Sequence, residues 1–330
     1  MNLFQFTRIV VRLARRIGYQ KNYNNLHLYP LLNKVQREFG EQLDDVQLKK
    51  MTHYYCLLVP PVLCENFTRI TGREMTEEER YKAMLMGINT PLFDDFFDSK
   101  EMTGDEIKQI THHPEAYPAQ NISEYTFSLC HNELLNTVKH PGYYREMTDR
   151  ILEAQYDSQS QFDPHISEEQ LTRITFEKGM YSLLIYHSIL DDQPSEAIKK
   201  LTWQLSGLMQ LTNDIFDIYK DLVSGITTLP NRSTDFSIFR KYFIKECIQL
   251  NKLAHALPYK RKRIIHFIVA MQLVISRGLV ALDQLEKLKD HYSLPLKIAQ
   301  VPREELICDM ELWSNRLSWM RYAYQMSKKE

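Results

Sequence analysis

Acidic residues gather in a short apolar stretch of the sequence, LFDDFFD, at residues 92–98. In a helix, Asp94 and Asp98 stand one turn apart on one face, with Asp95 beside Asp94. Carboxylates this close repel one another unless hard cations share their charge, and Mg²⁺ prefers oxygen ligands of this kind. The flanking residues are Leu92, Phe93, Phe96 and Phe97. The stretch therefore predicts metal ligands on an otherwise buried helix, and the alternative is an exposed acidic helix end.

A second acidic stretch, QLTNDIFDIYKD, occupies residues 210–221. On a helix, Asn213, Asp217 and Asp221 fall at i, i+4 and i+8. Asp214, Asp217 and Asp221 fall at i, i+3 and i+7, so both sets lie on one face. Apolar residues surround these oxygen ligands, which predicts a second buried helix carrying metal ligands.

The elements that must position these residues are helices. Apolar residues recur with a period of 3.6, and no alternating strand pattern bounded by turn residues is evident, so the fold class is predicted to be all-α. Capping pairs at Thr76 with Glu79, and at Ser167 with Gln170, mark two helix starts. The expected helices cover residues 3–18, 24–39, 45–70, 76–98, 103–112, 122–138, 142–156, 167–190, 195–222, 235–256, 260–290 and 302–327.

The chain is expected to form one domain over residues 1–330, with residues 1–40 as an amphipathic N-terminal extension. No repeat or linker argues for a boundary, although Pro60-Pro61 should kink or split the third helix. Arginines accompany the apolar residues of the first helix at helical spacing. We expect this helix to lie on the bundle, and a peripheral contact with a membrane surface is the alternative.

Bulk composition excludes several classes of function. The net charge of −1 gives no field that would attract nucleic acid. The five cysteines form no CxxC pair, which favours a reducing, cytoplasmic location over a disulfide framework or a zinc site. The longest apolar stretch, residues 264–275, is shorter than the roughly 20 residues that a membrane-spanning helix needs, so no such span is expected.

Together the two acidic motifs resemble those of the class I isoprenoid synthase superfamily. DDFFD matches the family's DDxxD motif without a gap, and QLTNDIFD is similar to its second motif, Q-x-x-(D/N)-D-x-x-D. Asn213, Asp217 and Asp221 also fit the cyclase form of that motif, with Asp in place of Ser and Glu, which leaves open whether Asn213 or Asp214 binds metal. The resemblance implies a single large bundle of the isoprenoid synthase type that holds three Mg²⁺, or Mn²⁺ instead, and an isoprenoid diphosphate.

Further segments are similar to the family's diphosphate-binding elements. Lys178-Gly179 resembles its helix break, Arg173 its diphosphate-sensing arginine, and Arg321-Tyr322 a pair that closes on diphosphate. An exposed Lys178 and a solvent-facing C-terminal helix are the alternatives. The residues expected to line the substrate pocket are Phe93, Phe97, Tyr181 and Gln210.

The activity implied by the resemblance is ionisation of an allylic isoprenoid diphosphate to form a linear or cyclic terpene. The paired arginines and N-terminal glycine-lysine segment of chain-elongating enzymes are not evident, which favours a terpene synthase. The alternative is a prenyltransferase of the head-to-head or head-to-tail kind, and the loop that ends in Leu229-Pro230 is similar to that of squalene and phytoene synthases. A non-catalytic helical protein that binds a lipid or a partner is the alternative of another class. Homodimers are common in the superfamily, so a homodimer is also considered.

Overall fold

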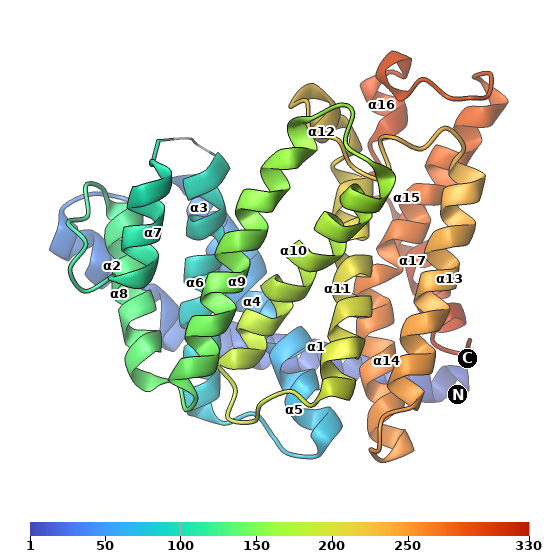
Figure 1. Cartoon of the computed structure of the whole chain (residues 1–330). Helices are drawn as coiled ribbons and strands as arrows, with labels where there is room; N and C mark the ends of the chain where they lie inside the picture. Colours follow the sequence, from blue (N-terminus) through green and yellow to red (C-terminus); the bar gives the residue numbers. More distant parts are fainter. Residues whose placement is uncertain (99–100, 330) are drawn as a thin grey trace. The chain divides into compact units, whose positions relative to one another are not determined.

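The computed structural model describes residues 1–98 and 101–329, and every regular element in these ranges is helical (Figure 1). The prediction of an all-α protein is therefore confirmed. The chain divides into two compact units. The DDFFD unit comprises Val10–Asp149 and Ile185–Gln193, and the NDIFD unit comprises Met1–Ile9, Arg150–Leu184 and Pro194–Glu330.

Three of the four boundaries between the units fall inside helices, in α1 (Leu3–Leu26), α9 (Pro141–Ser158) and α10 (Glu168–Ser188), and the fourth follows Gln193 in a connection. The sequence-based expectations of a single domain and of a separate N-terminal extension stay predictions. The two units are described one at a time below.

The DDFFD unit is built around α6, which packs most extensively against α8. Its elements are α2 (Leu28–Phe39), α3 (Asp45–Lys49), η1 (Lys50–Tyr55), α4 (Cys56–Val59), η2 (Pro60–Cys64), α5 (Glu65–Thr71), α6 (Glu77–Asp98), α7 (Gly104–His112) and α8 (Ile122–Thr137). The start of α6 has the predicted capping box: Glu79 N donates to Thr76 Oγ1 (3.1 Å), and Thr76 N donates to Glu79 Oε2 (2.9 Å). These bonds satisfy two backbone donors that the first turn of a helix leaves without partners.

The helix expected over residues 45–70 is observed as a helical run from Asp45 to Thr71, in which η1 and η2 are π-helical turns. Pro60 and Pro61 begin η2. Since neither proline has an N–H group, the α-helical ladder is interrupted there, as the sequence predicts. No comparable residue marks η1. Short π-helical turns inside helices often occur at functional sites.

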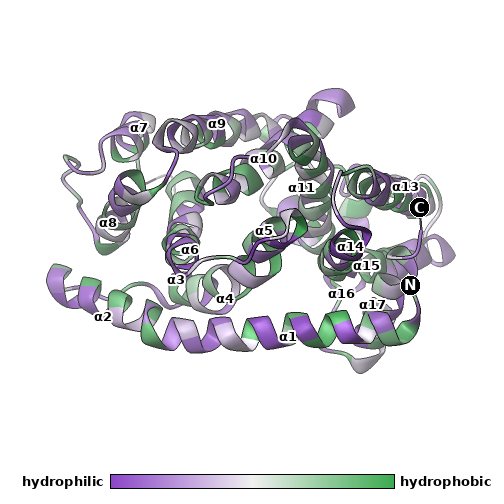
Figure 2. Ribbon diagram, turned by 90° about the horizontal axis from the view of Figure 1, so that it is seen from below, coloured by the Kyte–Doolittle hydropathy of each residue, from purple (hydrophilic) through white to green (hydrophobic). Residues whose placement is uncertain are grey.

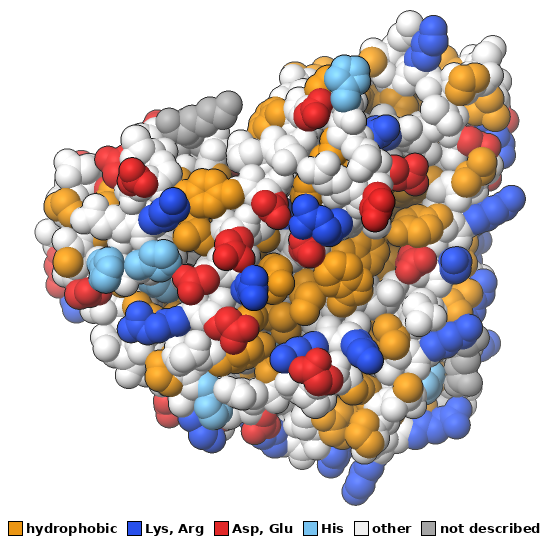
Figure 3. Space-filling model, viewed as in Figure 1, with side chains coloured by type: hydrophobic (Ala, Val, Ile, Leu, Met, Phe, Trp, Pro, Cys, Tyr) orange, Lys and Arg blue, Asp and Glu red, His pale blue; other side chains and the backbone are white. Residues whose placement is uncertain are grey.

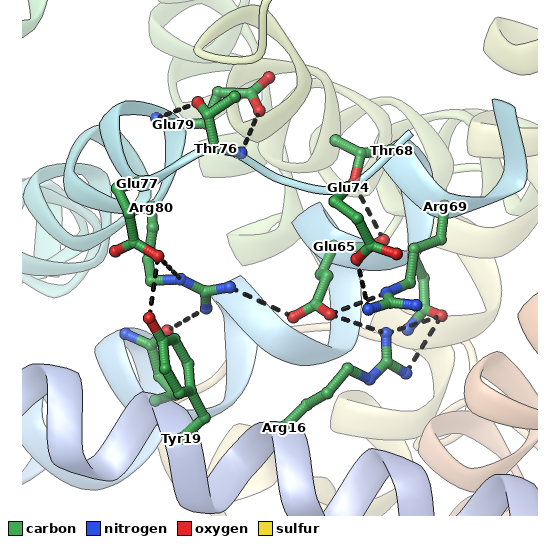
Figure 4. A network of polar contacts seen from close by, with 12 residues as sticks. Arg16, Tyr19, Glu65, Thr68, Arg69, Glu74, Thr76, Glu77, Glu79 and Arg80 are labelled. Atoms are coloured by element: carbon green, nitrogen blue, oxygen red, sulfur yellow. Dashed lines mark hydrogen bonds and ion pairs between the residues drawn. The ribbon is translucent and has the colours of Figure 1, made fainter. Parts of the chain in front are cut away.

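A network of charged side chains lies inside the DDFFD unit (Figure 4). The Glu65 carboxylate accepts ion pairs from Arg69 (2.8 Å), Arg80 (3.5 Å) and Arg16 (3.6 Å). The side chains of Glu65 and Arg80 are 5% and 6% exposed. Because isolated charges are costly to bury, this arrangement ties α1, α5 and α6 together through mutual neutralisation.

The NDIFD unit surrounds α11, which contacts α13, α14 and α15. Its remaining elements are α11 (Glu196–Phe216), α12 (Ile218–Val223), α13 (Phe236–His255), α14 (Arg261–Ile275), α15 (Arg277–Glu286), α16 (Arg303–Leu306), α17 (Trp313–Met326) and the 3₁₀ turns η3 (Gln159–Phe162), η4 (Lys287–Asp290) and η5 (Ile298–Gln300). The expected helix over residues 302–327 is wrong, because the chain leaves helical geometry after α16. There Asp309 Oδ1 accepts from Glu311 N (2.7 Å), a local bond that competes with the helical ladder.

One helical stretch, Arg261–Asp290, is long and apolar enough to cross a membrane by length and composition. However, 78% of its most apolar window is buried inside the protein. A core helix passes the same test, so this stretch is weak evidence for a span.

Candidate functional site

The first motif lies at the C-terminal end of α6, where Asp94 and Asp95 are half-buried and Asp98 is exposed. The expectation that the motif sits on an otherwise buried helix is confirmed, since Phe93 and Phe96 are 8% and 5% exposed. Both rings pack against Phe127 of α8. The motif is therefore held on a rigid, well-packed helix.

Pro91 stands inside α6, three residues before Asp94. It has no N–H group to donate to the carbonyl of Gly87, so the helical ladder loses one bond directly before the motif. The sequence analysis did not single out this proline, although a proline within a helical pattern is a recognisable signal.

Asp95 is already paired within the unit. Lys50 Nζ donates to Asp95 Oδ1 (2.8 Å), and Gln47 Nε2 donates to Asp95 Oδ2 (3.1 Å). Asp94 lies beside Tyr55, whose pKa is raised well above its usual value by burial and by the nearby Asp94 carboxylate. Lys50 and Tyr55 are the first and last residues of the π-helical turn η1. Their separation of some 40 residues from the motif left no sequence signal that would pair them with it.

The second motif spans the junction between α11 and α12. α11 ends at Phe216, and Asp217 occupies the junction with φ −91° and ψ 7°. Asp214 and Asp221 are buried, whereas Asn213 and Asp217 are exposed. The expected continuous helix over residues 195–222 is thus split at Asp217. Of the two residues left open as ligands, Asp214 is the one that shares the buried side with Asp221.

The Asp214 carboxylate is incompletely satisfied. Gln210 Nε2 donates to its Oδ1 (2.8 Å), but its Oδ2 is buried with no hydrogen-bond partner. Burial, opposed by the Gln210 bond and reinforced by repulsion from Asp221, raises the pKa of Asp214 to about 7. Burial and repulsion from Asp217 likewise raise the pKa of Asp221 to about 7. A bound cation would remove the cost of holding these groups ionised.

Lys220 has a larger effect than Lys178 on the pKa of Asp221, but Lys178 acts on both buried carboxylates. Its positive charge lowers the pKa of both Asp214 and Asp221, although the other effects outweigh it. Among the residues that the structure describes, none forms a hydrogen bond or an ion pair with its ammonium group. An ammonium group without a partner beside buried carboxylates could also meet an anionic ligand.

The predicted helix break at Lys178-Gly179 is wrong, because α10 is continuous through both residues. Gly179 instead permits a close approach of two helices: an added Cβ would stand 2.8 Å from the backbone oxygen of Ser206 on α11. The break is expected only from the resemblance, whereas the structure shows that the missing side chain of Gly179 lets the two helices pack closely.

The other predicted diphosphate ligands have partners of their own. Arg173 is exposed and pairs with Glu177 (2.7 Å) and Asp157 (3.4 Å). Arg321 is exposed, and its guanidinium lies 5.3 Å from the Tyr322 ring centroid.

The hydroxyl of Tyr322 is held in a separate group of residues. It donates to Asp283 Oδ2 and accepts from Arg240 Nη2 (3.1 Å). No hydrogen bond or ion pair between described residues links Tyr322 or Arg321 to the second motif.

The expected pocket residues lie in both units and are taken separately. In the DDFFD unit, Phe93 and Phe97 form an edge-to-face pair with centroids 5.4 Å apart. In the NDIFD unit, Tyr181 is half-buried and Gln210 is bound to Asp214. Phe93 thus serves as core packing for α6 and α8, while Gln210 lies within the second motif as expected.

The side chains of each motif fit Mg²⁺ by chemistry but are not assembled around a single point. Within the described ranges, no group of three or more His, Cys, Asp or Glu side chains is arranged to hold an ion. The atoms of the second motif that could bind a metal ion are all oxygens. One of them, Asp214 Oδ2, is buried without a hydrogen-bond partner. Figure 3 shows acidic and basic side chains close together on the face over α10 and α11, bordered by hydrophobic ones.

Comparisons with known proteins give no relative from which a function could be transferred. No protein-family model, no curated protein and no solved structure matches this chain.

Proposed function

We propose that this chain is a Mg²⁺-dependent class I terpene synthase that ionises an allylic isoprenoid diphosphate. The observation that carries the proposal is the buried Asp214 carboxylate with one unpartnered oxygen, repelled by Asp221 and Asp217 and lying under the influence of the Lys178 charge. Carboxylates can bind Mg²⁺ and a lysine can bind a diphosphate, so these side chains together suit a complex of Mg²⁺ with a diphosphate.

The residues that would hold Mg²⁺ on this proposal are Asp94 and Asp98 of the first motif and Asp214, Asp217 and Asp221 of the second. Bound Mg²⁺ would neutralise charge on the departing diphosphate, which leaves with the electron pair of the allylic C–O bond. Lys178 would donate to the diphosphate oxygens, and Gln210 would keep the Asp214 carboxylate in its orientation. The proposal draws no support from a helix break at Gly179, because α10 is continuous there.

The test begins with incubation of the purified protein with Mg²⁺ and geranyl, farnesyl, geranylgeranyl or geranylfarnesyl diphosphate, followed by extraction and mass analysis. Each reaction is run with and without isopentenyl diphosphate. A hydrocarbon or alcohol from one allylic diphosphate alone is the expected result. Longer diphosphates that need isopentenyl diphosphate would identify a chain-elongating prenyltransferase, and a doubled hydrocarbon would identify a head-to-head one.

A binding measurement separates the site from turnover. Inorganic diphosphate with Mg²⁺ should raise the melting temperature of the wild-type protein but not of Asp214→Asn or Lys178→Gln. Asp105→Asn is the matched control, because this carboxylate is exposed on α7. The absence of both turnover and a Mg²⁺-dependent shift would favour the non-catalytic alternative.

A further inference from the structure

The helix α1 exposes large apolar side chains along one side. Phe4 and Leu26 are 76% and 72% exposed, and Val11 is 44% exposed. At 100° per residue these three positions lie within about one quarter of the helix circumference. Phe6 and Leu13, on the opposite side, are buried at 3% and 6%. The inner side anchors the helix, so the outer apolar residues are not needed for packing within the chain.

Basic residues share this outer side. The first 37 residues contain seven Lys or Arg and no Asp or Glu, so the rest of the chain carries a net charge of −8. Arg8 and Arg15 lie between the exposed apolar positions, with Arg12 at their edge. No described residue forms an ion pair with these three, whereas Arg16 pairs with buried Glu65 (3.6 Å). We define the outer face of α1 as Phe4, Arg8, Val11, Arg12, Arg15 and Leu26.

We propose that the outer face of α1 docks on the surface of an anionic lipid bilayer. Helices that lie in a membrane interface combine apolar side chains, which enter the headgroup and acyl boundary, with Arg or Lys that meet anionic lipids. Figure 2 shows polar and apolar residues interspersed along α1. The proposal stands on α1 alone and does not rest on the proposed function.

Other occupants fit this face less well. A second copy of the chain packed on the same face about a two-fold axis would place three arginines against three arginines. A nucleic acid would satisfy the arginines but would leave Phe4, Val11 and Leu26 in water, since phosphates offer no apolar contact. A lipid surface satisfies both kinds of side chain.

The test is flotation of the full-length protein with vesicles of phosphatidylcholine alone or with 30% phosphatidylserine. We expect binding to the anionic vesicles and much weaker binding to the neutral ones. Each basic residue near an anionic surface contributes about fivefold in affinity, so Arg8→Gln, Arg12→Gln and Arg15→Gln together should weaken binding about 100-fold. The pair Phe4→Gln and Leu26→Gln should also abolish flotation, and all five residues are exposed or half-exposed, so the fold should persist.

Matched variants elsewhere control for loss of charge and of apolar surface. Trp313→Gln with Leu317→Gln removes apolar side chains on α17 that are 76% and 69% exposed. Lys241→Gln, Lys245→Gln and Lys252→Gln remove three exposed charges from α13. Both controls should float like the wild type. Equal losses in the control and α1 variants, equal binding to neutral vesicles, or a dimer that the α1 variants dissociate without any vesicle binding would each overturn the proposal.

Discussion

The ring of Phe176 on α10 lies against the bare Cα of Gly207 on α11, where an added Cβ would stand 2.2 Å from the ring Cδ1. Phe176 is 5% exposed, so its ring has little room to withdraw. We expect Gly207→Ala to lower the free energy of unfolding by about 1–3 kcal/mol, the usual cost of overpacking a core. Urea denaturation measures this change.

A second substitution tests whether overpacking, rather than a loss of helix flexibility, causes the destabilisation expected for Gly207→Ala. Phe176→Leu in the Gly207→Ala background should recover part of the lost stability, because the smaller side chain makes room for the new methyl group. Gly142→Ala is the control, since no heavy atom lies within 4 Å of its added Cβ and little change is expected. Equal destabilisation by both alanine substitutions would contradict the steric explanation.

Stability should depend on pH through Asp214. Its pKa rises from the ordinary 3.8 to about 7 in the folded protein, so the folded state retains a proton that the unfolded chain releases between about pH 4 and pH 7. The contribution of Asp214 therefore falls as pH rises through that window, by on the order of 4 kcal/mol, because each pKa unit is worth about 1.4 kcal/mol. In EDTA, Asp214→Asn should be more stable than the wild type at pH 8 and similar to it at pH 4.

Thermal melting of both proteins across this pH range provides the measurement. Equal melting temperatures at pH 8 would show that Asp214 is not buried as described. If Mg²⁺ binds the second motif, its addition at pH 8 should raise the melting temperature of the wild type but not of Asp214→Asn, because metal binding favours deprotonated ligands.

Lys50 competes with any cation for the Asp95 carboxylate, since its ammonium lies 2.8 Å from Oδ1. Lys50→Gln removes this positive charge, and the Mg²⁺ dissociation constant should fall by about three- to tenfold for charges at such a partly exposed position. Titration calorimetry with Mg²⁺ measures the change. Lys34→Gln, which removes an exposed charge from α2, should leave it unaltered. An unchanged constant in Lys50→Gln would show that the first motif does not bind the ion.

Glu65 forms ion pairs with three arginines in the DDFFD unit. Glu65→Gln should destabilise the protein by about 3–5 kcal/mol, because it leaves buried Arg80 without an opposing carboxylate at that position. Denaturant titration provides the measurement. The control is Glu153→Gln, which breaks an exposed pair with Arg150 and should change little. A small effect at Glu65 would mean that water reaches the network.

Much of the helical architecture could be predicted from periodicity and caps, but changes of helix type could not. The helix expected over residues 76–98 is observed as Glu77–Asp98, because its capping box and apolar face agree. The π-helical turn η1 changes the hydrogen-bond partner of each residue without introducing a glycine or proline. The apolar pattern over residues 45–70 therefore still reads as one helix.

The candidate site was only partly predictable for a related reason. Spacing along one helix brings Gln210 and Asp214 together, and their bond is observed. Spacing says nothing about residues from other helices, so the pairing of Lys50 with Asp95 was missed. The sequence also cannot tell whether a glycine breaks a helix or lets another helix approach. The break predicted at Gly179 was wrong for this reason.

The π-helical turn η1 makes the first motif sensitive to chain length. A π-helical turn accommodates one residue more than an α-helical turn, so deletion of one residue within Lys50–Tyr55 would restore α-helical phase. Because the turn absorbs this extra residue locally, its loss would leave the helix faces before and after the turn in place and would shift only the side chains within the turn. Lys50 and Tyr55, which lie beside the first motif, belong to this turn. A single-residue deletion at this point would therefore act on the contacts of the motif, whereas the same deletion between residues 224 and 235 would only shorten a connection.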